Sequence, residues 1–96
     1  MNLADIKDFL KHHQNEIQAH GILSLAVFGS VARNEATLTS DIDFLVEFSG
    51  KVTFDRYMDF KFYLEDNLGR NVDLVNPQML KPQIRQAILE EAIHVA

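Results

Sequence analysis

The chain has 96 residues, with 9 basic and 14 acidic side chains and a formal net charge of −5 at pH 7. This length fits a single domain over residues 1–96, and the 47% share of hydrophobic residues is normal for a globular protein. The acidic balance argues against direct nucleic-acid binding, which needs clustered Lys and Arg. Without cysteine, disulfides, thiolate nucleophiles and Cys-based zinc sites are excluded. We find no membrane-spanning run and no signal peptide, and expect a cytoplasmic protein with no membrane partner.

The first half of the chain is predicted to form a helix, a strand and a short second helix. Apolar residues recur at helical spacing over 3–19, and Gly21 follows as a stop signal. The continuous apolar run 22–28 is typical of a buried strand. Ser30 is a suitable N-cap, so we expect a short helix over 31–34 behind it.

A polar segment, 35–40, is expected to be a loop that leads into a second strand. Residues 41–48 alternate, with apolar side chains at the even positions and acidic ones at most of the odd positions. This is the pattern of a strand with one buried face. Thr53 is then a suitable cap for a helix over 54–68, with Gly69 as its C-terminal stop.

The last third of the chain predicts one more strand and one more helix. Residues 71–75 alternate and are followed by the strand-ending pair Asn76-Pro77, and Pro82 suits the first turn of a helix that runs to about residue 94. Strands that alternate with helices in this order predict an α/β fold, with helices packed on one sheet of three or more strands.

The pair Gly29-Ser30 directly follows the first predicted strand. Glycine lets the backbone turn tightly and approach a ligand. A helix that begins at Ser30 would present free N–H groups and the positive end of its dipole to a phosphate. A triphosphate cradle and an ordinary capped turn are both compatible with this pair, because Gly-Ser turns are common.

Three aspartates form the second candidate cluster. Asp41 and Asp43 are two residues apart on a predicted strand, so their carboxylates project from the same face. Two like charges side by side raise each other's pKa unless a cation compensates, and carboxylate oxygens suit Mg²⁺. Asp73 joins them if the second and third strands are neighbours. Three carboxylates could hold two metal ions, or hold one and activate a nucleophile. Solvated carboxylates on a polar edge are the alternative.

Together the two motifs form a spaced pattern, Gly29-Ser30, ten residues, then Asp41-x-Asp43. Chance produces it in a chain of this size with a probability on the order of 10⁻³. Followed by the strand that carries Asp73, the pattern resembles the nucleotidyltransferase superfamily that includes DNA polymerase beta. The small size makes the chain similar to the minimal nucleotidyltransferases (MNT), the antitoxin component of HEPN–MNT toxin–antitoxin pairs. The similarity extends over nearly the whole chain.

The resemblance implies a role for each motif residue. Gly29 and Ser30 would contact the nucleotide triphosphate, and Asp41 and Asp43 would bind Mg²⁺. Asp73 would be the third carboxylate. It would either bridge the side of the site that holds the metals or act as the base for an acceptor hydroxyl. The fold would be polymerase beta-like with a small mixed sheet, with two Mg²⁺ ions and ATP as the donor of AMP. The acceptor would be a tyrosine of the cognate HEPN toxin, whose RNase activity is thereby neutralised.

Other residues leave two interpretations each. Arg33 could clamp the triphosphate, or be a solvated arginine on a one-turn helix. Helix 54–68 spreads apolar side chains over roughly 200°, which predicts burial between the sheet and another helix, or a partner interface. Glu91 falls among apolar positions of the last helix, so its carboxylate is either buried and hydrogen-bonded or reaches solvent at the edge, and we prefer the second interpretation. No pair of histidines has zinc-motif spacing, so none is expected to bind metal. They are His12, His13, His20 and His94.

Two other classes of function stay open. The chain could be a non-catalytic antitoxin that neutralises its partner by binding. It could also act on a small molecule, as a nucleotidyltransferase or a metal-dependent phosphoesterase, although such enzymes usually carry an extra acceptor-binding domain. Because the sequence offers parts for a nucleotide and its metals but no evident acceptor pocket, a protein acceptor is the simpler expectation.

Overall fold

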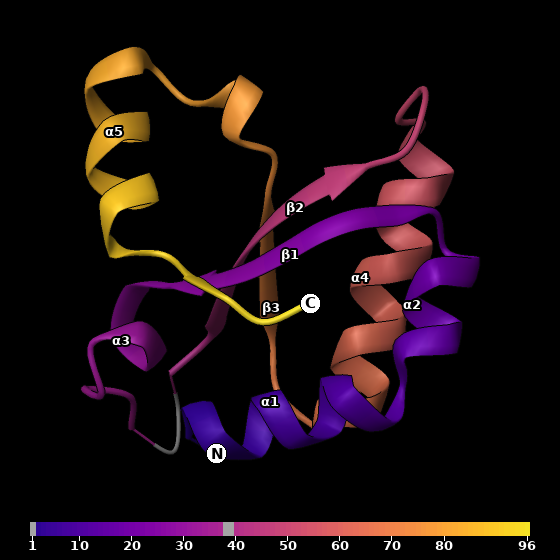
Figure 1. Cartoon of the computed structure of the whole chain (residues 1–96), viewed down its shortest axis with the longest axis horizontal. Helices are drawn as coiled ribbons and strands as arrows, with labels where there is room; N and C mark the ends of the chain where they lie inside the picture. Colours follow the sequence, from indigo (N-terminus) through magenta and orange to yellow (C-terminus); the bar gives the residue numbers. More distant parts are fainter. Residues whose placement is uncertain (1, 38–39) are drawn as a thin grey trace.

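Helices surround a single four-stranded sheet in the computed structural model of the chain, which describes residues 2–37 and 40–96 (Figure 1). The N-terminal helices and the long helix α4 lie together, and the C-terminal helix α5 stands apart from them (Figure 1). Within the described ranges, no helix is both long and apolar enough to span a membrane.

The sheet is mixed, with the strand order β3-β2-β1-β4. β1 (Ile22–Phe28) pairs antiparallel with β2 (Ile42–Phe48), and β2 pairs parallel with β3 (Val72–Val75). At the other edge, β4 (Ile93–His94) pairs antiparallel with β1. The α/β class and the small mixed sheet expected from the sequence are therefore confirmed.

Two N-terminal helices, α1 (Leu3–His12) and α2 (Gln14–Ala19), replace the single helix predicted there. The chain leaves helical geometry at His13, with φ −121° and ψ 23°. The His13 N–H bonds to the carbonyl oxygen of Leu10 at 3.2 Å, one residue short of the helical ladder, and its Nδ1 lies 2.7 Å from the carbonyl oxygen of Phe9. The Phe9 carbonyl oxygen, which the His13 N–H would reach in a continuous helix, is approached by the His13 side chain instead, and α1 ends here.

The long helix α4 (Phe54–Leu68) has the predicted bounds. The Thr53 hydroxyl oxygen accepts a hydrogen bond from the N–H of Arg56 at 3.2 Å, and Gly69 ends the helix with a φ of +68°. The wide apolar arc of this helix is only partly buried, because Phe54 and Phe62 remain 76% and 50% exposed. The residues that α4 buries in the core are Phe60, Leu64 and Leu68.

The core lies on one face of the sheet, beneath α1, α2 and α4. Even-numbered side chains of β2 point into it, as the alternation predicts. They are Ile42, Phe44, Val46 and Phe48, all buried. Odd-numbered side chains, among them Asp43, point to the opposite face, which we call the outer face.

The C-terminal segment differs from the prediction. After a 3-10 turn, η1 (Pro77–Met79), the helix α5 (Pro82–Glu91) ends three residues earlier than expected, and the chain returns to the sheet as β4. The Leu25 N–H donates to the carbonyl oxygen of Ala96 at 2.8 Å. The terminal residues follow β1 because its edge offers backbone partners that a continuing helix would leave unused.

Candidate active site

Asp43 and Asp73 stand side by side on the outer face of the sheet. They are direct partners in the parallel register of β2 and β3, so the pairing on which the predicted cluster depends is present. Asp41 immediately precedes β2 and is exposed. The structure thus pairs Asp43 directly with Asp73, and Asp41 lies two residues before Asp43 in the chain.

Asp43 is the carboxyl most affected by this arrangement. Its pKa is raised from 3.8 to about 6, first by burial, then by a hydrogen bond with the Asp73 carboxyl and by the charges of Asp73 and Asp41. The nearby Arg33 opposes this shift. Negative charge is therefore costly at Asp43, as expected where carboxylates gather without a compensating cation.

The Gly29-Ser30 turn lies against these carboxylates. Phe28, the last residue of β1, pairs with Asp43 in the antiparallel register, so the turn begins directly beside it. Gly29 has a φ of +72°, and a Cβ on it would overlap the Asp43 carboxylate. Only glycine therefore allows this close approach.

The short helix behind the turn begins earlier than predicted. α3 (Gly29–Ala32) has Phe28 as its N-cap, in extended conformation, so Ser30 lies in the first turn and is not the cap. The expected helix over 31–34 is accordingly displaced by two residues towards the N-terminus. Because α3 starts at Gly29, both Gly29 and Ser30 belong to the first turn of this helix.

Arg33, at the end of α3, is held by two carboxylates. Its Nη1 donates to Glu91 Oε1 at 2.8 Å and its Nε donates to Glu35 Oε2 at 3.2 Å. The hydrogen bonds to Glu35 and Glu91 raise the pKa of the Arg33 guanidinium. Two nitrogens of the Arg33 guanidinium are therefore engaged by carboxylates, while its side chain remains 48% exposed.

Glu91 combines features of its two sequence-based interpretations, because it is hydrogen-bonded within the fold and still partly exposed. Its side chain is 29% exposed, and Oε1 also accepts a hydrogen bond from the N–H of Gly29 at 2.5 Å. The only signal in the sequence was an acidic residue among apolar positions. Its partners are 58 and 62 residues away, so the pattern of the helix could not identify them.

Arg70 bonds to two residues that precede Asp41, Thr37 and Ser40. Its Nη2 donates to the carbonyl oxygens of Thr37 at 2.8 Å and Ser40 at 2.6 Å. Arg70 precedes β3, and the two carbonyls precede β2. One guanidinium therefore links the chain ahead of Asp73 to the chain ahead of Asp43. The sequence did not single out this residue.

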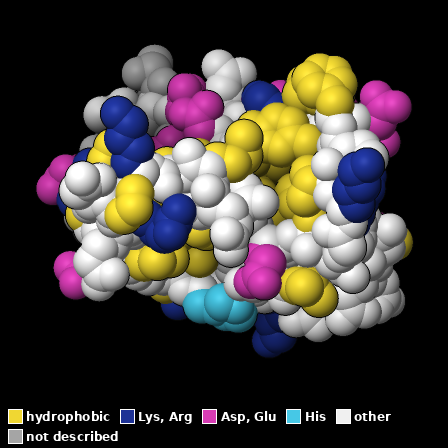
Figure 2. All heavy atoms as spheres, turned by 90° about the horizontal axis from the view of Figure 1, so that it is seen from above, with side chains coloured by type: hydrophobic (Ala, Val, Ile, Leu, Met, Phe, Trp, Pro, Cys, Tyr) yellow, Lys and Arg dark blue, Asp and Glu magenta, His cyan; other side chains and the backbone are white. Residues whose placement is uncertain are grey.

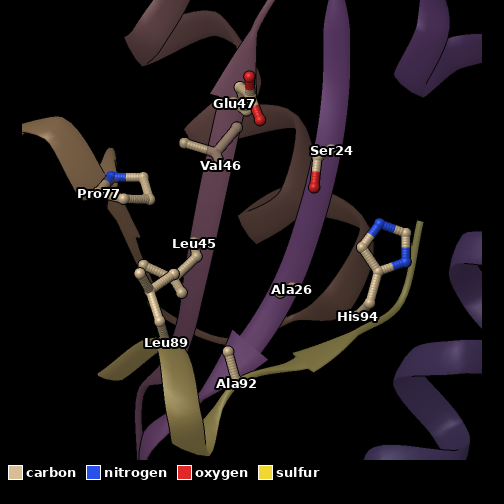
Figure 3. A pocket seen from close by; sticks show the side chains of 9 residues that line it. All are labelled: Ser24, Ala26, Leu45, Val46, Glu47, Pro77, Leu89, Ala92 and His94. Carbon is tan, nitrogen blue, oxygen red and sulfur yellow. The ribbon is translucent and has the colours of Figure 1, made fainter. Parts of the chain in front are cut away.

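An open hollow of about 240 Å³ lies on the same outer face (Figure 3). Leu45 and Glu47 follow Asp43 at alternate positions of β2, so the hollow continues along the face that carries the carboxylates. The residues that line it belong to β1, β2, β4, η1 and α5 or adjoin them. They are Ser24, Ala26, Leu45, Val46, Glu47, Pro77, Leu89, Ala92 and His94.

The carboxylate oxygens of the aspartate cluster are ligands that a hard cation such as Mg²⁺ prefers, but the cluster does not form a complete metal site by itself. Over residues 2–37 and 40–96, no three His, Asp or Glu side chains are grouped closely enough to hold an ion unaided. Asp43 and Asp73 nevertheless offer adjacent oxygens. Burial and then the neighbouring Asp73 raise the pKa of Asp43, and a bound cation would favour its ionised form. Of the histidines, His13 stacks on Phe9 and His20 packs against Phe60.

The fold and the paired motifs define the class of this protein, and comparison with known families agrees. Residues 3–95 match the nucleotidyltransferase domain family, and the chain belongs to it. It is therefore a nucleotidyltransferase in fold and motif.

The chain is also similar to individual proteins named as protein adenylyltransferases. The chain is 41% identical to a Methanocaldococcus jannaschii protein provisionally named a protein adenylyltransferase, over 97% of each chain. It is 35% identical to the protein adenylyltransferase MntA of Thermococcus cleftensis, over 99% of this chain and 97% of that one.

Solved structures share the architecture. One described provisionally as a minimal nucleotidyltransferase has a TM-score of 0.83 and 38% identity, and the match covers 97% of this chain and 95% of that one. An MNT antitoxin complex with a tri-AMPylated HEPN toxin from Shewanella oneidensis matches with a TM-score of 0.60 and 17% identity, over 90% of this chain and 71% of that one. At that identity the likeness concerns the fold alone.

Proposed function

We propose that this chain is a Mg²⁺-dependent nucleotidyltransferase that moves AMP from ATP to a tyrosine hydroxyl of a HEPN-type toxin, and so acts as its antitoxin. The observation that carries the proposal is the in-register pair Asp43 and Asp73 beside the Gly29-Ser30 turn. The relatives named as protein adenylyltransferases support a protein acceptor. We take residues 1–96 as a single catalytic domain that meets its acceptor on another protein, in the cytoplasm, where ATP is available.

We assign the site residues the following roles. Asp41, Asp43 and Asp73 would hold Mg²⁺, one ion or two, and Ser30 with the first turn of α3 would bind the triphosphate. Bound Mg²⁺ would neutralise charge on the phosphate oxygens as the transition state forms. Burial, and after it the neighbouring carboxylates, raise the pKa of Asp43, and the bound cation would offset this cost of ionising Asp43.

The transfer itself is an in-line displacement. The acceptor hydroxyl oxygen bonds to the α-phosphorus of ATP, and the bond from that phosphorus to the bridging oxygen breaks, so pyrophosphate leaves. Asp73 is exposed on the outer face and would accept the hydroxyl proton. The products are an AMP ester of the acceptor and pyrophosphate, so atoms and charge balance with no further reactant.

A labelling experiment tests this function. The chain is incubated with Mg²⁺, ATP labelled at the α-phosphate and a HEPN-type toxin encoded beside it, and the label on the toxin is measured. Asp43→Asn is the test variant, and Asp55→Asn, an exposed aspartate of α4, is the matched control. We expect labelling by the wild type and the control only. Equal labelling by Asp43→Asn would contradict the proposal.

Neutralisation by binding alone remains the second candidate, because α4 exposes Phe54 and Phe62. Figure 2, which views the molecule from above, shows that hydrophobic side chains reach the surface there among charged ones. A toxin-protection assay in cells separates the two functions. Full protection by Asp43→Asn, lost in a Phe54→Ser, Phe62→Ser variant, would favour masking over catalysis.

A small-molecule acceptor is the remaining alternative. Its signature is turnover of a hydroxyl-bearing small molecule, such as an aminoglycoside, by the isolated chain with ATP and Mg²⁺. Turnover without a partner protein would replace the protein acceptor in this proposal while leaving the nucleotidyl transfer in place.

A further inference from the structure

The last residue of α5 reaches the turn that follows β1. Glu91 Oε1 accepts two hydrogen bonds, from the N–H of Gly29 at 2.5 Å and from Nη1 of Arg33 at 2.8 Å. Both donors belong to the helix α3 and the turn that opens it. A single carboxylate oxygen therefore fixes the start and the end of this four-residue helix.

The same turn also lies against Asp43. Gly29 approaches the Asp43 carboxylate so closely that a Cβ would overlap it. The turn therefore adjoins a carboxylate of β2 and is hydrogen-bonded to a carboxylate of α5. Moving Glu91 would change the position of Gly29 and Ser30 relative to the aspartate cluster.

Hydrogen-bond capacity adds a second consequence. A backbone N–H has one hydrogen to donate, and that of Gly29 is used by Glu91. The phosphate contact expected from Gly29 therefore falls to Ser30 and the next residues of α3. Gly29 contributes to the site because it has no side chain that would overlap Asp43. Glu91, by bonding to the Gly29 N–H, orients Ser30 and the rest of α3.

We propose that Glu91 is a positioning residue for the nucleotide-binding turn: through the Gly29 N–H and the Arg33 guanidinium it holds Ser30 in the orientation that binds the triphosphate of ATP. The inference rests on the proposed function and adds a residue outside the two sequence motifs. β4 begins two residues after Glu91 and pairs with β1 through Ile93 and Val27. The C-terminal segment is therefore attached to both the strand and the turn of the site.

The test compares three variants for ATP binding in the presence of Mg²⁺ by calorimetry. Glu91→Ala removes both hydrogen bonds, and Glu91→Gln keeps an acceptor oxygen for Gly29 but loses the charge that faces Arg33. Glu90→Ala is the matched control, since the neighbouring Glu90 is exposed and bonds to Gln86 on its own helix.

We expect the Kd for ATP to rise about tenfold in Glu91→Ala, the scale of one charge-assisted hydrogen bond, and less in Glu91→Gln. Glu90→Ala should bind as the wild type does. The backbone amide resonance of Gly29 reports the contact independently of ATP: its shift should change in Glu91→Ala and be largely kept in Glu91→Gln. Circular dichroism confirms that each variant is folded.

The outcomes separate this inference from the function on which it rests. Wild-type affinity in Glu91→Ala, with the Gly29 resonance shifted, would reduce Glu91 to a structural contact and overturn the proposal. An unchanged Gly29 resonance in Glu91→Ala would overturn it as well, because the contact would then be absent. Tighter ATP binding in Glu91→Ala would also overturn it, because Glu91 would then compete with the phosphates for the same donors. Failure of the wild type to bind ATP would instead contradict the proposed function.

Discussion

Asp43 and Asp73 face each other across the parallel pair β2–β3, and burial together with this neighbour raises the pKa of Asp43 to about 6. The ordinary value is 3.8, so the folded state binds the Asp43 proton more tightly than the unfolded chain. The contribution of this group to stability is therefore fully present below the ordinary pKa, and it is lost as pH rises through the folded value.

The first prediction concerns this pH dependence. Without divalent cations, the free energy of unfolding of the wild type should fall relative to Asp43→Asn as pH rises from about 4 to above 6. Urea denaturation at a series of pH values measures the difference. Asp55→Asn should keep the wild-type profile. A constant difference between wild type and Asp43→Asn over this range would show that Asp43 has an ordinary pKa.

The second prediction concerns Mg²⁺. Since ionised carboxylates bind the cation and protonated ones do not, Mg²⁺ should raise the thermal midpoint more above pH 6 than below it. The thermal shift with and without Mg²⁺ is recorded at both pH values for wild type and Asp43→Asn. The variant should show little shift at either pH. Equal shifts in the two proteins would place the cation elsewhere.

The third prediction compares two glycines with nearly the same backbone conformation. Gly29 and Gly50 have φ values of +72° and +71°, but a Cβ at Gly50 meets nothing within 4 Å. Gly50→Ala should cost about 1 kcal/mol, from the left-handed conformation alone. Gly29→Ala carries the same cost plus the overlap with Asp43, and should also weaken ATP binding. Chemical denaturation of both variants measures the difference, and equal losses would contradict the close approach at Gly29.

The fourth prediction concerns catalysis by the carboxylates. Asp43→Asn should lower the rate of AMP transfer by about 10² to 10³, the scale for removing one group that stabilises transition-state charge. Asp73→Asn should do the same if this carboxylate takes the acceptor proton. Single-turnover transfer with labelled ATP gives the rates. Loss of toxin binding in either variant would instead indicate that the aspartates form the interface.

The fifth prediction concerns Arg70, which joins the segment before Asp41 to the start of β3. Arg70→Ala should weaken Mg²⁺-dependent transfer, because Asp41 is no longer held beside the other carboxylates. Arg56→Ala is the control, since Arg56 donates to the carbonyls of Ser49 and Lys51 beyond the opposite end of β2. A higher Mg²⁺ concentration should restore transfer in Arg70→Ala. Equal losses in both variants would indicate general destabilisation.

Local patterns in the sequence predicted most of the elements. The alternation over 41–48, the Thr53 cap and the Gly69 stop depend on neighbours in the chain, and the structure confirms all three. The break at His13 was missed because it depends on side-chain hydrogen bonding within a segment of good helical periodicity. The strand at 93–94 was missed because two residues are too short for a pattern.

By itself, the sequence determined the class of chemistry. The spacing of Gly29-Ser30 and Asp41-x-Asp43 is a property of the chain, and it identified the nucleotidyltransferase family that the comparison confirms. Only the tertiary structure decided how these residues meet. The parallel pairing of Asp43 with Asp73 and the contact of Glu91 with Gly29 join segments far apart in the chain. Such contacts depend on how the sheet is ordered and where α5 ends, and neither property is encoded in the residues that flank either partner.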